Sequence, residues 1–596
     1  MTVTAVEFYR HLNKCDSDGT TRISHLDIIE DVKIDDTNFK GNALNFTNCR
    51  FYGKLEFDSS TNMLGVKFIA CTFTILSFRN VTLKDIQDKS VDGGRIAFIE
   101  CSIRDILEIK NCILDKNLLI ERRSEIKDII IAESILDTIH LNETSINHNL
   151  QVIKCRITSD IKIESSKIQS RTLLIQTICK RVLFYESTHV TSIEIAGGEI
   201  KESLIFHRAN IEGNTQIVGV KTSNNPNQPI SSLLFIDSSL KKECSIAYPK
   251  EKEAVGFQHI LLRASSFENG LNIKGSDLQD RLNDTDNLRI DCSRQLKGEI
   301  GFQDMKITST YINGVNSDAS IIFNNTQFTK LALHNFTNNY NLQFINISPL
   351  DSLDTKLVIE NSHLGKTQFA STNLANFGSI LIENSNLTDI SASTTKWFSL
   401  TQLRVNWPKK KWYKTFRMAV PVSMRALYLH HCRQQRELFR QLKFAMEKQG
   451  DRIQSLEFKQ YEMIAYRNAL NLSKGKIGER LIMWVNRSNS YGQNWWKPVL
   501  WAIGITALFY FLITTAQSPD INGVEFSRNG ANRLWSTLWK NLGVFFQMLN
   551  PVHLIDKMSE GAQEINKMTY FLDYLYRIII SYLIFQTISA FRKYVK

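Results

Sequence analysis

An apolar repeat fills the first two-thirds of the chain and constrains the fold more than any other feature. Large apolar residues recur at offsets 0, 2 and 7, as in Leu44, Phe46 and Phe51, and the next copy usually starts ten or eleven residues later. Offsets 0 and 2 place two side chains on one face of a strand, and offset 7 lies beyond a bend. An α-helix, with about 3.6 residues per turn, cannot keep this spacing. The pattern therefore predicts a parallel β-solenoid with about eleven residues in each strand-turn unit and two units in each coil.

The clear copies of this repeat extend over most of the first 400 residues. They begin at Leu44, Val66, Leu76, Ile96, Leu107, Ile129, Ile139, Leu150, Ile161, Ile193, Leu204, Ile260, Leu271, Leu357 and Ile380. A single coil cannot bury its own apolar face, so stacking of the coils must form the core.

A second position of the repeat, at offset 5, is nearly always occupied by a small residue, and we call these residues the small column. Its members include Cys49, Cys71, Cys101, Cys112, Ser134, Thr144, Cys155, Ser166, Gly198, Ala209, Ser238, Ser265, Ser276, Ser362 and Ser385, with Val81 and Met305 as larger exceptions. Small residues are expected here because the coil must turn tightly at this point. Five of the ten cysteines lie in this column, and we interpret them as small buried hydrophobic residues rather than as a metal or redox cluster. Reduced thiols are typical of the cytosol.

The period and the small inward column resemble those of pentapeptide-repeat and related right-handed β-helix proteins of bacteria. The chain does not keep the strict A-(D/N)-L-x-x motif of the pentapeptide repeats. Some of those solenoids mimic DNA through a strongly acidic surface. Residues 1–400 carry a net charge of only −5, which argues against DNA mimicry here.

Positive charge is concentrated directly after the repeat. Between Thr401 and Lys443 there are eleven Lys or Arg residues and one acidic residue, Glu437. Within this stretch, Trp407–Lys414 mixes cations with aromatic rings, a combination that can hold a polyanionic backbone and stack bases. The same segment can equally lie at a membrane surface or cap the solenoid. The candidate ligand-binding residues are Lys409, Lys410, Lys411, Trp412, Lys414 and Arg417.

A helical hairpin is predicted next, with helices over His431–Gln449 and Asp451–Asn471 that are separated by Gly450. Apolar residues that can face each other across the hairpin are Leu438, Leu442 and Ala445 in the first helix, and Leu456, Tyr461 and Ile464 in the second. We expect Glu447, Glu457 and Glu462 to be ion-pair partners of the many cations rather than catalysts.

Two membrane spans are predicted near the carboxyl end. Pro498–Ala516 contains nineteen residues without a charge, and about twenty apolar residues are needed to cross a bilayer. The second span runs over Met568–Phe591 and carries Asp573 and Arg577 one helical turn apart, where they can pair with each other. Ionisable groups inside a span usually face protein or water, so these two are candidate pore or gating residues; snorkelling near an interface is the alternative.

Basic residues flank both spans. Lys474, Lys476, Arg480, Arg487 and Lys497 precede the first span, and Arg592, Lys593 and Lys596 follow the second. The loop between the spans has five basic and five acidic residues. The positive-inside rule then predicts that both termini and the solenoid are cytoplasmic.

The loop between the spans contains an apolar stretch, Leu534–Asn550, that is too short and too interrupted to cross a bilayer. A re-entrant or interfacial helix suits this stretch, and an amphipathic loop that rests on the outer leaflet is the alternative. Two spans around such a segment resemble the pore unit of small tetrameric cation channels. No T-V-G-Y-G filter is present, so strong potassium selectivity is not expected. The candidate pore residues in this stretch are Phe545, Phe546, Gln547 and Asn550.

These features predict eight consecutive segments. They are an N-terminal cap at 1–25, a solenoid sensor at 26–392, a basic aromatic connector at 393–431, a helical hairpin at 432–472, a juxtamembrane segment at 473–497, a first span at 498–516, an extracytoplasmic or re-entrant loop at 517–567, and a second span with a basic tail at 568–596. Two spans cannot enclose water alone, so a channel requires a homo-oligomer.

This architecture resembles the membrane-channel effectors of bacterial anti-phage defence, in particular the Hailong-type channel subunits. The resemblance implies a ligand-gated ion channel in a bacterial inner membrane, with a partner nucleotidyltransferase that makes single-stranded DNA oligomers. These oligomers would hold the channel shut until phage infection removes them. The resulting opening would depolarise the membrane. A tetramer is expected from the likeness to small tetrameric cation channels. The alternative is a membrane-anchored solenoid scaffold without channel activity. The chain has no G-x-x-x-x-G-K-[ST], H-E-x-x-H or G-x-S-x-G motif, and neither enzyme activity, nor a cofactor, nor a metal is expected.

Overall fold

The computed structural model describes most of the chain. The described residues are 1–16, 19–39, 43–59, 63–84, 94–186, 188–222, 230–249, 256–276, 284–350, 354–403, 422–472, 477–517, 535–536, 538–540, 542–550, 552 and 567–591. The chain divides into two units, Met1–Arg404 and Val405–Lys596.

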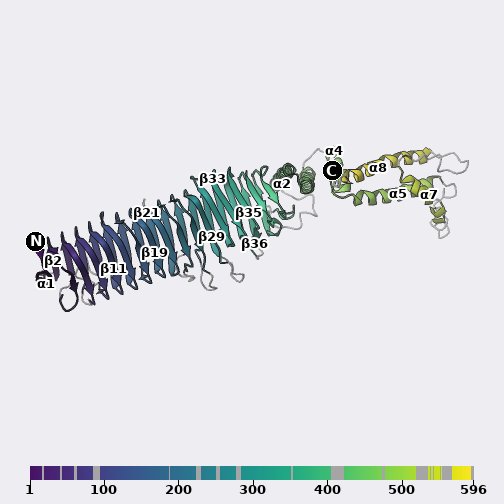
Figure 1. The fold of residues 1–596 in the computed structure, drawn as a ribbon. Helices are drawn as coiled ribbons and strands as arrows, with labels where there is room; N and C mark the ends of the chain where they lie inside the picture. Colours follow the sequence, from purple (N-terminus) through teal and green to yellow (C-terminus); the bar gives the residue numbers. More distant parts are fainter. Residues whose placement is uncertain are drawn as a thin grey trace. The chain divides into compact units, whose positions relative to one another are not determined.

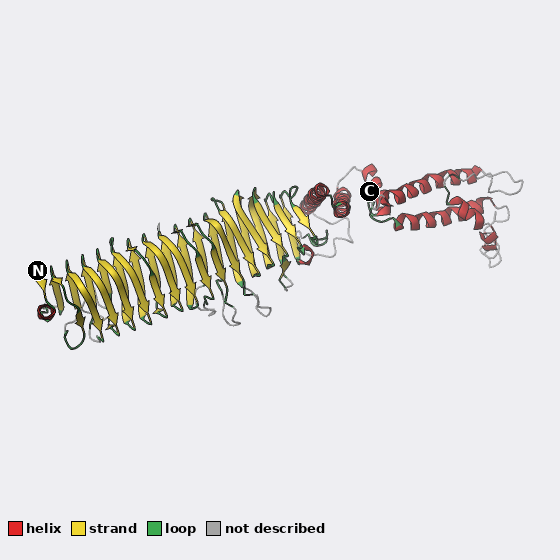
Figure 2. Ribbon diagram, in the orientation of Figure 1, coloured by secondary structure: helices red, strands yellow, loops and turns green. Residues whose placement is uncertain are grey.

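The first unit is a parallel β-solenoid of about 16 coils, as the repeat predicts. Its strands stack in two parallel sheets of 21 and 19 strands (Figures 1 and 2). One sheet consists of β1 Thr2–Val3, β3 Asp27–Ile28, β4 Val32–Ile34, β6 Arg50–Asp58, β8 Thr72–Arg79, β11 Ser102–Lys110, β13 Glu125–Ala132, β15 Ser145–Ile146, β16 Leu150–Ile153, β19 Lys167–Ile175, β21 His189–Ala196, β23 Asn210–Ile211, β24 Thr215–Val218, β26 Ser239–Leu240, β27 Cys244–Ala247, β29 Ser266–Lys274, β31 Lys297–Gln303, β33 Asp318–Asn324, β35 Asn341–Ile345, β38 Thr367–Ala370 and β40 Ser391–Ser393.

The other sheet lies on the opposite half of each coil. It consists of β2 Thr20–Ser24, β5 Ala43–Thr47, β7 Gly65–Ile69, β9 Thr82–Leu83, β10 Ile96–Ile99, β12 Ile113–Glu121, β14 Ile135–Asn142, β17 Arg156–Ile157, β18 Asp160–Glu164, β20 Ile178–Tyr185, β22 Glu199–His207, β25 Ser232–Ile236, β28 His259–Arg263, β30 Thr285–Cys292, β32 Lys306–Asn316, β34 Gln327–Asn338, β36 Ser348–Pro349, β37 Lys356–Glu360 and β39 Ser379–Glu383. One short 3-10 helix, η1 Leu374–Asn376, lies between β38 and β39.

Strand register explains the repeat length. Ile96 pairs with Leu118, and Leu118 pairs in turn with Ile139, so neighbouring strands lie 22 and 21 residues apart in sequence. One coil therefore contains two units of ten or eleven residues.

The described residues at offsets 0, 2 and 7 of the repeat are buried, apart from the half-buried Ile382; Leu278 lies outside the described residues. Because the coils stack in register, identical side chains form ladders: the Phe68 ring stacks at 5.0 Å on Phe46 and at 5.1 Å on Phe98.

The small column at offset 5 also carries hydrogen bonds between coils. Nearly all of its residues follow a residue in the left-handed region, for example Asn111 (φ 54°) before Cys112 and Glu133 (φ 50°) before Ser134; Ser276, which follows Gly275, is an exception. The Ser134 hydroxyl accepts a hydrogen bond from the Cys112 amide at 3.0 Å and donates to the carbonyl of Ala132 at 2.7 Å. Ser and Thr recur here because the corner leaves a buried amide that needs an acceptor, which an argument from side-chain size alone misses.

Both ends of the solenoid are covered. Helix α1 Ala5–Leu12 begins at a capping box formed by Thr4 and Glu7, and it places Phe8, which is fully buried, over the ring of Phe46. The first coil already lies within the segment predicted as a cap, since β2 pairs with β5. At the other end the Trp397 ring packs edge-on against Phe369 at 5.9 Å. Helix α1 thereby shields the first strands from pairing with other chains, and Trp397 covers part of the apolar core in the last coil.

Nine of the ten cysteines are buried, and Cys15 is exposed. Burial raises the pKa of Cys101, Cys112 and Cys155 to about 11, so these thiols stay protonated near neutral pH. We expect a thiol-alkylating reagent to modify one cysteine of the native protein rapidly and all ten after unfolding, because the thiolate is the nucleophile. Mass spectrometry of the labelled chain measures the count, and Cys15→Ser should remove the single fast site. Rapid modification of several native thiols would contradict the buried column.

The second unit begins with the predicted hairpin. Helices α2 Val422–Gln449 and α3 Arg452–Leu472 pack against each other, and Gly450, at φ 82°, lies in the turn between them. The α2 face is as predicted, with Leu438, Leu442 and Ala445 buried. On α3, Phe458 and Ala465 are buried, whereas the predicted Leu456, Tyr461 and Ile464 are half-buried. Of these three, Tyr461 packs on Phe439 of α2 with ring centroids 5.1 Å apart, so the buried face is only partly rotated from the predicted one. The rotation turns Glu462 inward, where it pairs with Lys443 at 3.0 Å.

Five further helical elements have described bounds in the second unit, and residues 535–536 and 538–540 are also helical. The five are α4 Ile477–Asn486, the 3-10 helix η3 Arg487–Asn489, α5 Trp496–Gln517, α7 Leu542–Met548 and α8 Lys567–Phe591. Helices α5 and α8 are the two described helices that are long and apolar enough to cross a membrane, in agreement with the predicted spans.

Candidate pore unit

The predicted ligand-binding residues lie outside the described part of the chain. Lys409, Lys410, Lys411, Trp412, Lys414 and Arg417 all fall in 404–421, between the last coil and α2. The predicted pore residues are all described, in α7, in the turn that follows it and in α8.

Helices α5 and α8 form an antiparallel pair, which lies side by side in Figure 2. Trp495, just before α5, stacks on Phe591 at the end of α8 with ring centroids 5.1 Å apart. At mid-length the hydroxyls of Thr506 and Tyr576 are 2.9 Å apart and buried. With 22 and 25 residues, the helices are about 33 and 37 Å long, enough for a hydrocarbon core of about 30 Å.

The short helix α7 packs against the loop-side halves of both long helices. Met548 is fully buried between Phe509, Tyr510 and Tyr576. The Tyr576 hydroxyl donates a hydrogen bond to the carbonyl of Met548 at 2.6 Å. The last carbonyls of a helix have no intrahelical partner, so this bond satisfies a group that would be costly to leave unpaired in an apolar environment.

A second tyrosine holds the segment before α7. The Tyr510 hydroxyl donates to the carbonyl of Leu538, and the Tyr510 ring packs edge-on against Phe545 at 5.9 Å. The described residues 538–540 and 542–548 of the loop therefore lie against α5 and α8.

The four predicted pore residues of this loop do not face the same way. Phe545 packs inward against the helix pair, whereas Phe546 keeps 63 % of its surface exposed. Gln547 and Asn550 are also exposed, and the Asn550 side chain accepts a hydrogen bond from the amide of Val552 at 3.1 Å. Phe546, Gln547 and Asn550 are thus exposed in the single chain, and Phe545 holds α7 in place.

Asp573 and Arg577 pair with each other, as their spacing on α8 predicts. The Arg577 Nε lies 2.7 Å from an Asp573 carboxylate oxygen. Asp573 is 4 % exposed, and the pair lies on the half of α8 that carries Tyr576. A paired charge costs far less in an apolar environment than an isolated one, so the pair allows α8 to carry both groups.

Sequence reasoning missed a polar clamp beside the first span. Asn489 is 3 % exposed, and its amide donates a hydrogen bond to the side chain of Gln586 near the end of α8. Its own oxygen accepts from the Gly492 amide at 2.9 Å. This bond joins residues 97 apart in sequence, so no local pattern could have indicated it. The clamp fixes the turn between α4 and α5 against α8.

Charged side chains on the solenoid pair between neighbouring coils. Arg181 binds both carboxylate oxygens of Asp160 at 2.9 and 2.6 Å, and Arg79 pairs with Glu108 at 2.7 Å. Among the described residues there is no cluster of three His, Cys, Asp or Glu side chains that could hold a metal ion.

The chain was compared with protein-family models, with curated proteins and with solved structures, and none of the three comparisons gives a match.

Proposed function

We propose that the protein is a homo-oligomeric, ligand-gated ion channel in a bacterial inner membrane, and that it acts as an effector of anti-phage defence. Helices α5 and α8 cross the bilayer, and the solenoid and both termini are cytoplasmic. A nucleotide or single-stranded DNA signal made by a partner nucleotidyltransferase binds the basic connector. Release of that signal opens the pore and depolarises the cell.

The packing of α7 is the observation that carries the channel proposal. A simple membrane anchor needs only two spans and a loop. Here the buried Tyr576 hydroxyl bonds to the last turn of α7, and the Tyr510 hydroxyl bonds to the segment just before it. This arrangement presents Phe546 and Gln547 on an exposed face. Several copies arranged around an axis could bring these faces together, and a ring of phenylalanines can close a pore by excluding water.

Ion flux through the purified full chain in liposomes tests this proposal. A channel conducts under some ligand condition, whereas a membrane-anchored scaffold leaks nothing with or without an added single-stranded DNA oligomer. A ligand gates the pore only if it binds the open and closed states unequally, so the oligomer should change the flux. Equal and negligible flux in all conditions would favour the scaffold.

Replacement of Phe546 with serine should raise the basal flux several-fold, because a polar ring lets water and ions enter a hydrophobic constriction. The matched control is Phe585→Ser, which changes a similarly exposed phenylalanine of α8 that does not contact α7. Flux is measured with an ion-sensitive dye trapped in the liposomes. Equal flux for Phe546→Ser and the unchanged chain would remove Phe546 from the gate.

A further inference from the structure

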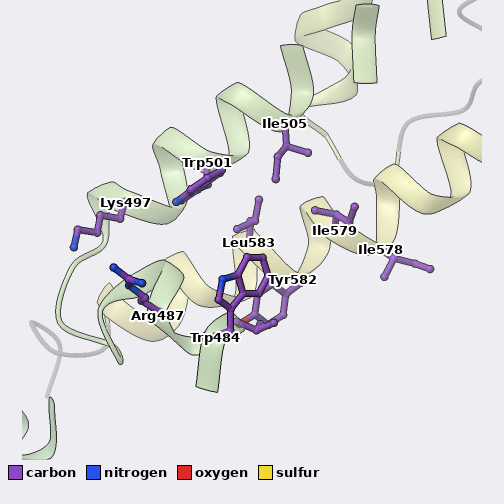
Figure 3. A pocket seen from close by; sticks show the side chains of 10 residues that line it. Trp484, Arg487, Lys497, Trp501, Ile505, Ile578, Ile579, Tyr582 and Leu583 are labelled. Atoms are coloured by element: carbon purple, nitrogen blue, oxygen red, sulfur yellow. The ribbon is translucent and has the colours of Figure 1, made fainter. Parts of the chain in front are cut away.

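A cavity of about 720 Å³ lies between α4, α5 and α8, on the side of the pair where the first span begins. It is bounded by apolar side chains from all three helices, among them Trp484 of α4, Trp501 and Ile505 of α5, and Ile579 and Leu583 of α8 (Figure 3). Its volume is within the range of sites for small organic ligands. Trp484 and Trp501 are 69 % and 59 % exposed, so the cavity is open along one side.

Two cations lie together at one end of this apolar cavity. Figure 3 shows Arg487 and Lys497 at that end, with the isoleucines of α8 at the other. The Lys497 ammonium donates one hydrogen bond to the Ser490 hydroxyl at 2.8 Å. No carboxylate in the described part of the chain forms an ion pair with either cation. Two cations next to each other favour an anion between them.

The exposed apolar side chains of α4 indicate at which depth of the membrane the cavity lies. Ile477, Leu481 and Ile482 of α4 are exposed by 78, 61 and 60 %, although α4 also carries charged residues. On its other face Arg480 donates to the Leu470 carbonyl of α3 at 3.1 Å. A helix with one exposed apolar face directly before a membrane span is typical of an interfacial helix that lies in the headgroup region. The cations then lie at headgroup depth and the isoleucines deeper.

We propose that this cavity is a binding site for one anionic phospholipid of the cytoplasmic leaflet. An acyl chain lies against Trp501, Ile505 and Leu583, and the phosphate lies between Arg487 and Lys497. The Asn489–Gln586 clamp keeps the site open by fixing the turn that carries Arg487 against α8. The site rests on the membrane placement of α5 and α8 in the proposed function, and it does not require that the protein conducts ions.

Native mass spectrometry of the full chain in mild detergent tests the site, with phosphatidylglycerol and phosphatidylcholine of the same acyl composition as probes. We expect the chain to retain phosphatidylglycerol in preference to phosphatidylcholine. The double substitution Arg487→Gln with Lys497→Gln should weaken phosphatidylglycerol binding by about a hundredfold, since each of the two charge-assisted contacts contributes about tenfold. Arg487→Lys with Lys497→Arg should retain the lipid. The matched control, Arg433→Gln with Lys459→Gln, removes two exposed cations of the hairpin and should leave binding unchanged.

The outcomes distinguish binding through the headgroup charge from binding through the acyl chain. Equal retention of the two lipids, or unchanged retention by the double glutamine variant, would overturn the site. Displacement of the lipid by inorganic phosphate alone would also overturn it, because the anion would then bind without the acyl chain. Ile579→Trp, which fills the cavity without changing charge, should abolish retention. If the chain retains the lipid but shows no ion flux, the channel proposal is contradicted and the lipid site is supported. If the chain shows normal flux but does not retain the lipid, the lipid site is contradicted and the channel proposal is supported.

Discussion

Replacement of Phe68 with alanine is expected to lower the free energy of unfolding of the solenoid by about 3–5 kcal/mol. Phe68 is fully buried, and its ring stacks on both Phe46 and Phe98, with further edge-on contacts to Phe57 and Phe73. The rigid coils above and below cannot collapse into the vacated space, because their backbones are held by ladders of parallel hydrogen bonds. The substitution therefore loses the transfer free energy of the ring and leaves a cavity as well.

The effect of Phe68→Ala should be local, because each coil of a solenoid contacts only its neighbours. Native-state hydrogen exchange of the full chain can measure it coil by coil. Protection should fall most in the strands around residues 43–110 and little in β31–β40. Tyr52→Ala is the matched control: Tyr52 lies in the same coil region but is 49 % exposed, and its loss should cost less than about 1 kcal/mol. Equal losses for the two variants would contradict the ladder as the main source of stability.

The solenoid could be predicted from the sequence because its information is local and repeated. A single copy of the pattern, such as Leu44, Phe46 and Phe51, is compatible with several folds. Its recurrence every ten or eleven residues is compatible only with a repeated strand-turn unit. The spans could be predicted for a similar reason, since length and absence of charge over Pro498–Ala516 suffice. In both cases the prediction needs no knowledge of which distant residues meet.

The packing around α7 and the lipid cavity could not be predicted, because they depend on contacts between distant segments. The bonds from Tyr576 to Met548 and from Asn489 to Gln586 join residues 28 and 97 apart, and tyrosine or asparagine near a span has several ordinary roles. The hairpin shows a smaller failure of the same kind. Its α3 face was predicted from Leu456, Tyr461 and Ile464, and Tyr461 does pack on Phe439 of α2. The buried face also includes Glu462, because the half-buried Lys443 across the hairpin compensates the carboxylate.

Replacement of Glu462 with glutamine is expected to destabilise the hairpin by about 3–5 kcal/mol, because it leaves the charge of Lys443 buried without a counter-charge. The Lys443 and Glu462 side chains are only 16 % and 5 % exposed, and the ammonium lies 3.0 Å from the carboxylate. Glutamine keeps the shape of the side chain and removes only the charge. A loss of hairpin stability of this size would therefore have an electrostatic cause. Hydrogen exchange of α2 and α3 in the full chain measures the free energy of opening.

The hairpin itself supplies the matched control. Glu437 pairs with Arg440 at 2.8 Å, but these side chains are 48 % and 50 % exposed, and Glu437→Gln should cost no more than about 1 kcal/mol. The double substitution Lys443→Met with Glu462→Leu should recover most of the stability that Glu462→Gln loses, since an apolar pair of similar volume removes the unpaired charge. Similar costs for Glu462→Gln and Glu437→Gln would mean that water reaches the Lys443–Glu462 pair. Because the hairpin lies in sequence between the basic connector and the spans, its loss should also weaken any effect of a connector-bound ligand on ion flux.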